Sequence, residues 1–170
     1  PAKRLVVIGA STGGPRALQR ILAQLPARFA APVLVVQHIA NGFTQGLADW
    51  LSGETALRVA LAREGEGLVP GRVYVAPEYW HTVPDAQALH LVSTPHTPLI
   101  PSVDVAMQAA ARSWGSRAIG VLLTGMGSDG AQGLLAIRRA GGVTIAQDQA
   151  TSTIFGMPRV AIEVGAAQKV

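Results

Sequence analysis

The feature that most constrains the fold is a series of short apolar, β-rich runs separated by segments with helical periodicity. Leu5–Gly9, Val33–Gln37 and Ala118–Leu123 are almost entirely apolar and lack the alternation of a strand with one face in water. Between the first two runs, apolar residues recur at helical spacing over Pro15–Leu25. Buried strands that alternate with helices predict a mostly parallel sheet with helices on both faces.

The rest of the chain continues this alternation. Thr44 and Ser102 stand where two further helices begin and are candidate N-caps. Thr82–Val92 predicts a small antiparallel hairpin, and the three prolines of Ser93–Pro101 predict a loop. Further helices are expected at 44–51, 102–114, 128–140 and 158–164, and further strands at 57–60, 73–76 and 143–146. The predicted class is α/β, a doubly wound, mostly parallel sheet with a small antiparallel hairpin.

Composition narrows the function classes. With 170 residues, 49% hydrophobic and 14% charged, the chain suits one globular domain and is far from a disordered composition. It has no cysteine, which excludes disulfides, thiol catalysis and cysteine zinc sites. The net charge of +4 comes without a long basic run, so nucleic-acid binding is not expected. No run is long enough for membrane insertion and no signal peptide opens the chain, so we expect a cytoplasmic protein.

The turn after the first predicted strand carries a serine. Ligands of such sheets bind beyond the carboxyl ends of the strands. There, Gly9–Gly14 has the pattern G-x-S-x-G between a strand and a helix. In a nucleophile elbow this pattern raises the serine hydroxyl above the sheet, which makes Ser11 a candidate nucleophile. A glycine-rich phosphate cradle, or a plain tight turn, would use the same residues.

A histidine follows the second buried strand. His38 should point into the same crevice as Ser11, where a neutral imidazole can accept the serine proton and return it to a leaving group. The alternative for a single histidine here is a structural role, with its ring hydrogen-bonded at the strand end. The other histidines are weaker candidates, because His90 lies on the predicted hairpin and His81 and His96 lie in loop-like segments.

An aspartate lies in the glycine-rich turn Thr124–Gly130, again between a buried strand and a helix. Asp129 can orient His38 and stabilise its imidazolium form, and the N–H of Met126 is well placed to meet an oxyanion. The alternative is capping, because Ser128 or Asp129 could instead satisfy backbone donors at the start of the next helix.

Together these turns are more informative than any one of them. Ser11, His38 and Asp129 each follow a different buried strand, and the carboxyl ends of parallel strands meet at one edge of a sheet. Their chain order, Ser, His, Asp, differs from the Ser, Asp/Glu, His order of the α/β-hydrolases. The main alternative to an esterase is a phosphate- or nucleotide-binding α/β module without hydrolytic activity. Neither an acidic ribose partner nor a set of metal carboxylates occurs at a convincing spacing, so no cofactor and no metal are expected.

Longer motifs around these turns occur together in one known family. The sequence resembles the CheB-type protein-glutamate methylesterases of bacterial chemosensory systems, in the family's order and over nearly the whole chain. The matching segments are Val7–Gly14, Gln37–Ile39, Gly42–Thr44, Pro70–Gly71, Val75–Pro77, Pro101–Asp104, Leu123–Gly130, Ala146–Gln147 and Phe155–Pro158. Such a series is far more specific than a single glycine motif.

The resemblance implies a set of site residues and a reaction. Ser11 would be the nucleophile, His38 the general base and acid, and Asp129 the residue that orients the histidine. Met126 would supply a backbone oxyanion donor, with Thr12 as a helper beside the reaction centre. The implied reaction is hydrolysis of glutamate γ-methyl esters on chemoreceptors to glutamate and methanol, and some members also deamidate receptor glutamines.

The resemblance also implies partners. These are the cytoplasmic domain of a methylated chemoreceptor and, in longer family members, an N-terminal receiver domain of a two-component system. No receiver pattern is found in this sequence, and residues 1–170 are interpreted as a single methylesterase catalytic domain.

Two segments depart from the family's pattern, and both are expected near the substrate entrance. Glu78–His81 stands where the family usually has Gly-Asp-x-His. His96–Ile100 stands where the family is often rich in Asn, His and Arg. A degenerate member that only docks on receptors is a further alternative, but the serine, histidine and aspartate are all present.

Overall fold

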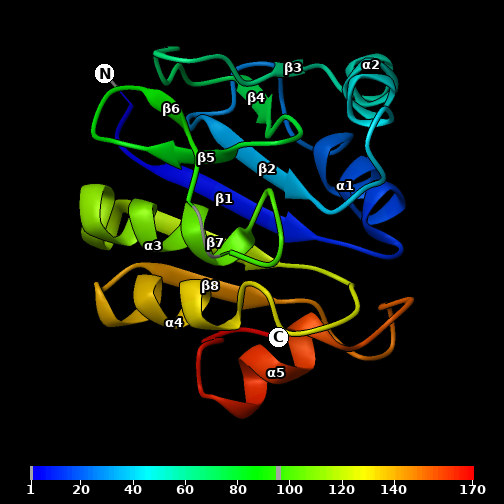
Figure 1. The fold of residues 1–170 in the computed structure, drawn as a ribbon, viewed down its shortest axis with the longest axis vertical. Coiled ribbons are helices and arrows are strands. Elements are labelled where there is room, and N and C mark those ends of the chain that lie inside the picture. The colour runs from blue at the N-terminus through cyan, green and yellow to red at the C-terminus, as the bar shows by residue number, and fades with distance from the viewer. Residues whose placement is uncertain (1, 95–96) are drawn as a thin grey trace.

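A six-stranded parallel sheet forms the centre of the fold within residues 2–94 and 97–170, which the computed structural model describes (Figure 1). The strands lie in the order β3-β4-β2-β1-β7-β8, and neighbouring strands run parallel. Their bounds are β1 Leu5–Ala10, β2 Val33–Gln37, β3 Arg58–Leu61, β4 Arg72–Val75, β7 Ala118–Leu122 and β8 Val143–Ala146. The predicted sheet is confirmed. His96, in the predicted loop, lies outside the described residues.

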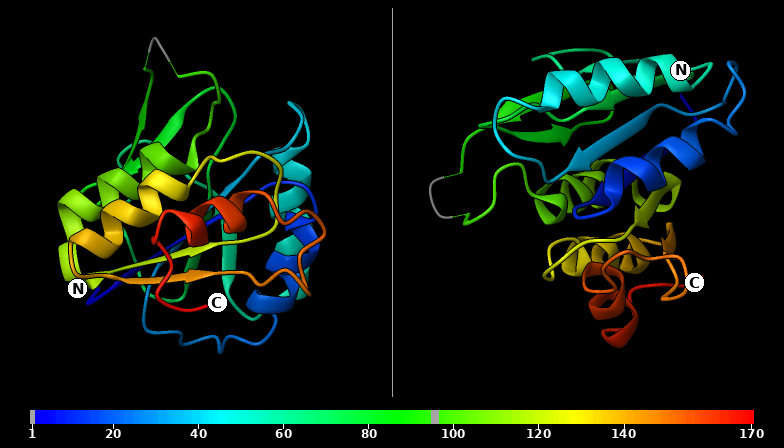
Figure 2. Two further views of the ribbon diagram at one scale, coloured as in Figure 1. Left: turned by 90° about the horizontal axis from the view of Figure 1, so that it is seen from below. Right: turned by 90° about the vertical axis from the view of Figure 1, so that its right-hand side faces the viewer.

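Helices cover both faces of this sheet, as Figure 2 shows in two further views. One face carries α1 Gly14–Leu22 and α2 Thr44–Glu54, and the other carries α3 Val103–Trp114, α4 Ala131–Arg139 and α5 Met157–Glu163. From β1 the chain proceeds through α1 to β2 in one direction, and from β7 through α4 to β8 in the other. Right-handed crossovers in opposite directions put their helices on opposite faces. The carboxyl ends of β1 and β7 therefore flank a topological switch point, where α/β proteins bind ligands.

Each face of the sheet has its own apolar core. Successive side chains of a strand point to opposite faces. In β1, Leu5 and Val7 pack with apolar residues of α3, α4 and α5, whereas Val6 and Ile8 pack with those of α1 and α2. Burial on both faces explains why the strand sequences are almost continuously apolar.

The small hairpin is confirmed as β5 His81–Pro84 paired antiparallel with β6 Leu89–Val92. It packs against α3, and the indole N–H of Trp114 at the end of that helix donates to the carbonyl of Asp85 at 2.8 Å. The hairpin therefore supports the helix whose first turn lies at the carboxyl edge of the sheet.

Some helix starts differ from the sequence-based prediction. Thr44 is the first residue of α2 and not its N-cap, which is Phe43. Its hydroxyl instead donates to Glu78 Oε1 at 2.9 Å, and the N–H of Gly42 donates to the same oxygen at 2.6 Å. The acceptor at this helix start thus comes from the loop after β4, which a local capping pattern cannot reveal.

Candidate active site

Ser11 is the first residue after β1 and stands in a turn that leads directly into α1. The N–H of Gly14 donates to the carbonyl of Ser11 at 2.7 Å and closes this turn. Gly13 has a φ of 81°, in the left-handed region that favours glycine, and a Cβ there would lie 2.4 Å from Thr153 Oγ1. The strand–turn–helix context that a nucleophile elbow requires is therefore present.

His38 lies beside Ser11 at the end of the neighbouring strand. Ala10 and Gln37 are partners in the β1–β2 register, and the N–H of His38 donates to the carbonyl of Ala10 at 2.9 Å. The side chain of Gln37 adds a second link, because its Nε2 donates to the carbonyls of Ser11 and His38, both at 2.8 Å. The two backbones are thus one inter-strand spacing, ~4.8 Å, apart.

The pleat of the two strands directs both side chains to the same face of the sheet. Val7 of β1 and Val36 of β2 are buried in the core on the α3 and α4 side. Because side chains alternate along a strand, Ser11 and His38 continue the rows of Val7 and Val36. The turn before α4, which carries Asp129, lies on this same side.

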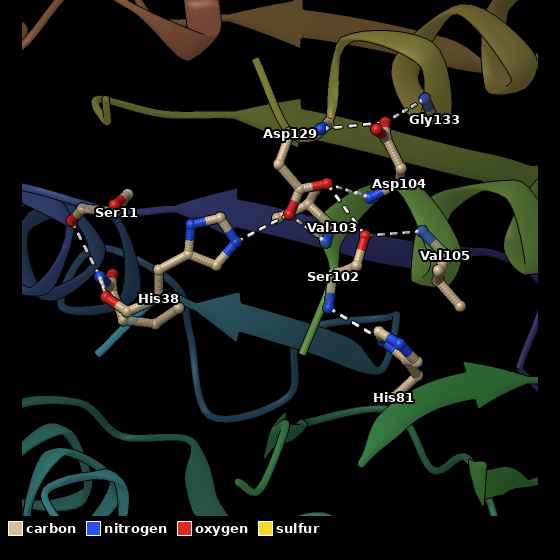
Figure 3. Close-up of polar contacts among 11 residues, drawn as sticks. Ser11, His38, His81, Ser102, Val103, Asp104, Val105, Asp129 and Gly133 are labelled. Atoms are coloured by element: carbon tan, nitrogen blue, oxygen red, sulfur yellow. Dashed lines mark hydrogen bonds and ion pairs between the residues drawn. The ribbon is translucent and has the colours of Figure 1, made fainter. Parts of the chain in front are cut away.

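Asp129 contacts His38 from the turn between β7 and α4 (Figure 3). Its Oδ2 lies 2.7 Å from Nε2 of His38. The same carboxylate accepts backbone N–H bonds from Val103 at 2.7 Å and Asp104 at 2.9 Å, and a bond from the Ser102 hydroxyl at 3.0 Å. Asp129 therefore joins the imidazole to the first turn of α3.

Neither Ser128 nor Asp129 caps the helix that follows it, so the capping alternative is wrong. The N-cap of α4 is Gly130, without a side-chain capping bond. Oδ1 of Asp104, in α3, accepts the N–H groups of Gly130 at 2.9 Å and Gly133 at 2.7 Å. The two helices thus exchange carboxylates: Asp129 precedes α4 and binds the start of α3, while Asp104 of α3 binds the start of α4.

Asp129 is stabilised as an anion although it is buried. Burial alone raises its pKa, but the hydrogen bonds from His38 and from the N–H groups of Asp104 and Val103 outweigh burial, and the pKa lies below its ordinary value. The positive end of α3 favours the same charge. Because a carboxylate can only accept, Nε2 of His38 carries a proton, which leaves Nδ1 as the acceptor of the neutral ring.

The Ser11 hydroxyl lies near the His38–Asp129 pair but, among the described residues, makes no hydrogen bond to it. Figure 3 shows the His38 ring between Ser11 and Asp129. Within the described residues no hydrogen bond links the Ser11 hydroxyl to the imidazole, whereas the imidazole and Asp129 are in direct contact. Hydrogen bonds to a nucleophile often tighten only when substrate binds.

Thr12 and Met126 carry backbone N–H groups that donate to no protein acceptor in the described ranges. Their turns lie against each other, since the N–H of Ser11 donates to the carbonyl of Thr124 at 3.0 Å. A Cβ on Gly125 would lie 2.6 Å from Cβ of Ser11. The Met126 turn is therefore in direct contact with the serine, and both turns offer unused donors beside it.

Three residues of this network are not among the predicted site residues: His81, Ser102 and Asp104. The sequence predicts Ser102 only as the N-cap of α3, and that role is confirmed by the bond from the N–H of Val105 at 3.3 Å. The motif Pro101–Asp104 was the available signal, but capping patterns do not reveal a contact with a residue of a distant turn.

The remaining described histidines have structural surroundings. His81, expected in a loop-like segment, lies in β5 and is fully buried, which lowers its pKa. Its Nδ1 accepts the N–H of Ser102 at 3.0 Å. His90 of β6 instead contacts Glu64 at 2.9 Å and Asp85 at 2.8 Å and does not reach the site.

The carboxyl edge of the sheet presents a hydroxyl, an imidazole, a carboxylate and free N–H groups, which suit acyl transfer. In residues 2–94 and 97–170, no three His, Cys, Asp or Glu side chains gather in a way that could hold a metal ion. The helices of the same ranges are too short or too polar to cross a bilayer.

A parallel α/β sheet with a serine elbow, a histidine–aspartate pair and free N–H donors at one switch point has the architecture of a serine hydrolase. A comparison with protein families then narrows this class. The chain belongs to the CheB methylesterase family, whose model matches residues 6–170.

Known proteins of this family match closely. The crystal structure of the Thermotoga maritima CheB methylesterase catalytic domain is similar with a TM-score of 0.96 and 42% identity, over 100% of this chain and 93% of that one. A protein-glutamate methylesterase/protein-glutamine glutaminase of Anaeromyxobacter dehalogenans is 53% identical over 98% of this chain and 49% of the relative. The protein-glutamate methylesterase FrzG of Myxococcus xanthus is 49% identical over 100% of this chain and 52% of the relative.

The chain therefore spans about half the length of the curated relatives it matches. The match with the solved catalytic domain confirms the fold that the resemblance implies. None of these proteins supports the alternative of a phosphate- or nucleotide-binding module without hydrolytic activity.

Proposed function

We propose that residues 1–170 form the catalytic domain of a serine esterase that hydrolyses glutamate γ-methyl esters on chemoreceptor proteins to glutamate and methanol. The observation that carries the proposal is the His38–Asp129 pair, joined at 2.7 Å, at the strand end next to Ser11. Relatives are named protein-glutamine glutaminases as well, so deamidation of receptor glutamines belongs to the same proposal.

The first half of the reaction forms an acyl-enzyme. Ser11 Oγ attacks the ester carbonyl carbon while Nδ1 of His38 accepts the hydroxyl proton. Asp129 stays ionised and stabilises the imidazolium that forms. The imidazolium then gives its proton to the departing methoxide, and methanol leaves. Acid–base help of this kind typically contributes about 10²–10⁴-fold in rate.

The second half releases the acid. Water attacks the acyl carbon, His38 accepts its proton, and the proton returns to Ser11 Oγ as glutamate leaves. In both halves negative charge develops on the carbonyl oxygen, and the N–H groups of Met126 and Thr12 are proposed to bind it. Removal of one oxyanion donor typically costs about 3–4 kcal/mol of transition-state stabilisation.

The edge of the sheet around Ser11 suits a protein substrate. Exposed large apolar side chains follow β2, β4 and β7 or precede α3, in the loops on this side of the sheet: Phe43, Tyr79, Trp80, Leu99, Ile100 and Met126. Exposed apolar patches with polar surroundings are typical of protein contacts. We propose the cytoplasmic domain of a methylated chemoreceptor as substrate. We also propose that a receiver domain in a longer protein regulates access to this edge. The proposed location of the protein is the cytoplasm.

Labelling with a serine-directed phosphonate tests the catalytic roles. The wild-type chain should be modified at Ser11, and Ser11→Ala should not react. His38→Ala should react about 10²–10⁴-fold more slowly, because the hydroxyl loses its base. His90→Ala is the matched control, since it removes another histidine with carboxylate partners, and it should react like wild type. Peptide mass spectrometry locates the adduct.

Methanol release from a methylated receptor then tests the substrate. The proposal predicts release by wild type and none by Ser11→Ala. A wild-type chain that stays unmodified while a control esterase reacts, or a label that persists in Ser11→Ala, would reject the catalytic assignment. Normal labelling without methanol release would reject the receptor ester alone.

A further inference from the structure

The Asp129 carboxylate is held at both oxygens. Oδ2 is shared by Nε2 of His38 and the N–H of Val103, each at 2.7 Å. Oδ1 accepts the N–H of Asp104 at 2.9 Å and the Ser102 hydroxyl at 3.0 Å. Within the described residues, Ser102 and His38 are the two side chains that bind this carboxylate, and they bind opposite oxygens.

The Ser102 hydroxyl is oriented by its other contacts. It is buried, and its oxygen accepts the N–H of Val105 at 3.3 Å as the N-cap of α3. Because Asp129 can only accept, the hydroxyl hydrogen points at Oδ1. The backbone is fixed as well, since the N–H of Ser102 donates to Nδ1 of buried His81 at 3.0 Å.

An N-cap needs only an accepting oxygen, so the bond from Ser102 to Asp129 is additional to capping. The terminal torsion of an aspartate is broad, and without Ser102 only the N–H of Asp104 would restrain Oδ1. With Ser102 on Oδ1 and His38 on Oδ2, rotation breaks charge-assisted bonds at both oxygens.

We propose that Ser102 is a positioning residue of the esterase, whose hydroxyl acts with the N–H groups of Val103 and Asp104 to fix the rotation of the Asp129 carboxylate so that Oδ2 faces His38. This inference rests on the proposed function. Ser102 is buried and acts through its bond to Asp129.

Substitution can separate this role from capping. Glycine is nearly as good an N-cap as serine but has no hydroxyl, so Ser102→Gly removes the bond to Asp129 and largely keeps the cap. Ser102→Thr keeps both. Ser113 is the matched control, because its hydroxyl, at the other end of α3, donates to the carbonyl of Pro84 at 3.1 Å.

The experiment measures kcat and KM on methylated receptor and the rate of phosphonate labelling for wild type, Ser102→Gly, Ser102→Thr and Ser113→Ala. Loss of a hydrogen bond to a charged group predicts that kcat and the labelling rate of Ser102→Gly fall by about ten-fold or more. KM should stay unchanged, because Ser102 is buried and its side chain acts through Asp129. Ser102→Thr and Ser113→Ala should behave like wild type.

A second measurement does not depend on activity. Titration of the Asp129 carboxyl carbon by ¹³C NMR should give a higher pKa in Ser102→Gly than in wild type, because the anion loses a donor. The pKa should be unchanged in Ser113→Ala.

Wild-type kinetics and an unchanged Asp129 titration in Ser102→Gly would leave Ser102 as a cap and overturn the inference. An equal loss in Ser113→Ala would overturn it too, since the effect would then follow the stability of α3. If the wild-type chain has no serine reactivity, the proposed function fails instead, and the Asp129 titration still decides whether Ser102 holds the carboxylate.

Discussion

His38 and His90 both contact carboxylates, but they differ in burial and in the number of carboxylates that they contact. The side chains of His38 and Asp129 are 15% and 7% exposed, and α3 supplies donors that keep the aspartate ionised. The His90 side chain is 38% exposed and has a carboxylate at each ring nitrogen, Glu64 at Nδ1 and Asp85 at Nε2. A ring that faces an acceptor at both nitrogens is stabilised as imidazolium, whereas a ring with one acceptor can work as a base.

The first residue-scale prediction concerns His90. Hydrogen bonds from the imidazolium to Glu64 and then Asp85 raise its pKa above the ordinary 6.5. A raised histidine pKa stabilises the fold fully below 6.5, and this contribution is lost as pH rises through the folded value. In an NMR titration His90 should therefore titrate above 6.5, and Glu64→Gln should bring its pKa down. A wild-type value at or below 6.5 would contradict the pairing.

At the scale of residues, the sequence was sufficient to predict that Ser11, His38 and Asp129 lie close together, but it did not predict the residues that surround them. Ser11, His38 and Asp129 each follow a recognisable buried strand, so strand order brings them to one edge. Ser102 joins them through its hydroxyl, which donates to Asp129, and His81 joins them through the N–H of Ser102, which lies 21 residues further along the chain. Such contacts depend on how the hairpin and α3 pack, which no local pattern encodes.

At the scale of elements, α3 and α4 are joined by their exchanged carboxylates. Each helix start would otherwise leave backbone N–H groups without partners in a partly buried place. Asp129 and Asp104 supply those partners reciprocally. From the sequence, Ser128 or Asp129 is considered as a cap only of its own helix, because local capping is the usual pattern, and the role of Asp104 at the start of α4 is not predicted.

Asp104→Ala tests this exchange. The N–H groups of Gly130 and Gly133 lose their shared acceptor, so the free energy of unfolding should fall by about 1–3 kcal/mol. Urea unfolding followed by circular dichroism measures the change. Asp104→Asn keeps an amide oxygen in place and should lose less. Equal losses in the two variants would contradict the acceptor role.

At the scale of the whole molecule, the sheet is the frame that aligns the site. Ser11 follows the central strand β1 and is flanked by the ends of β2 and β7, with His38 on one side and Gly125 on the other. Buried parallel strands are rigid, so a site built on their ends keeps its geometry.

Gly125→Ala tests the contact between these strand ends. The added Cβ would lie 2.4 Å from Met157 Sδ and 2.6 Å from Cβ of Ser11, so the serine turn must shift. Phosphonate labelling should slow by about 10²-fold, the effect of a displacement near 1 Å in a reacting group. Gly53→Ala, on α2 with no atom within 4 Å of the new Cβ, is the control and should label like wild type. Normal labelling of Gly125→Ala would mean that the turn tolerates the shift.

The architecture of the sheet was predictable because several parts of the sequence indicate it independently. Continuous apolar runs such as Val33–Gln37 identify buried strands without any knowledge of their neighbours, and helices between them imply parallel pairing. Helix starts were less predictable, since α2 and α4 take their first-turn acceptors from residues elsewhere in the chain.

The mutual capping of α3 and α4 has a consequence for how the proposed activity would be lost. Neither helix can fray at its start by itself, because unwinding either one withdraws the counter-charge from the other. The aspartate that serves the histidine is one of those two counter-charges. Local unfolding at the starts of α3 and α4 would therefore abolish the proposed esterase activity while the strands beneath are still intact.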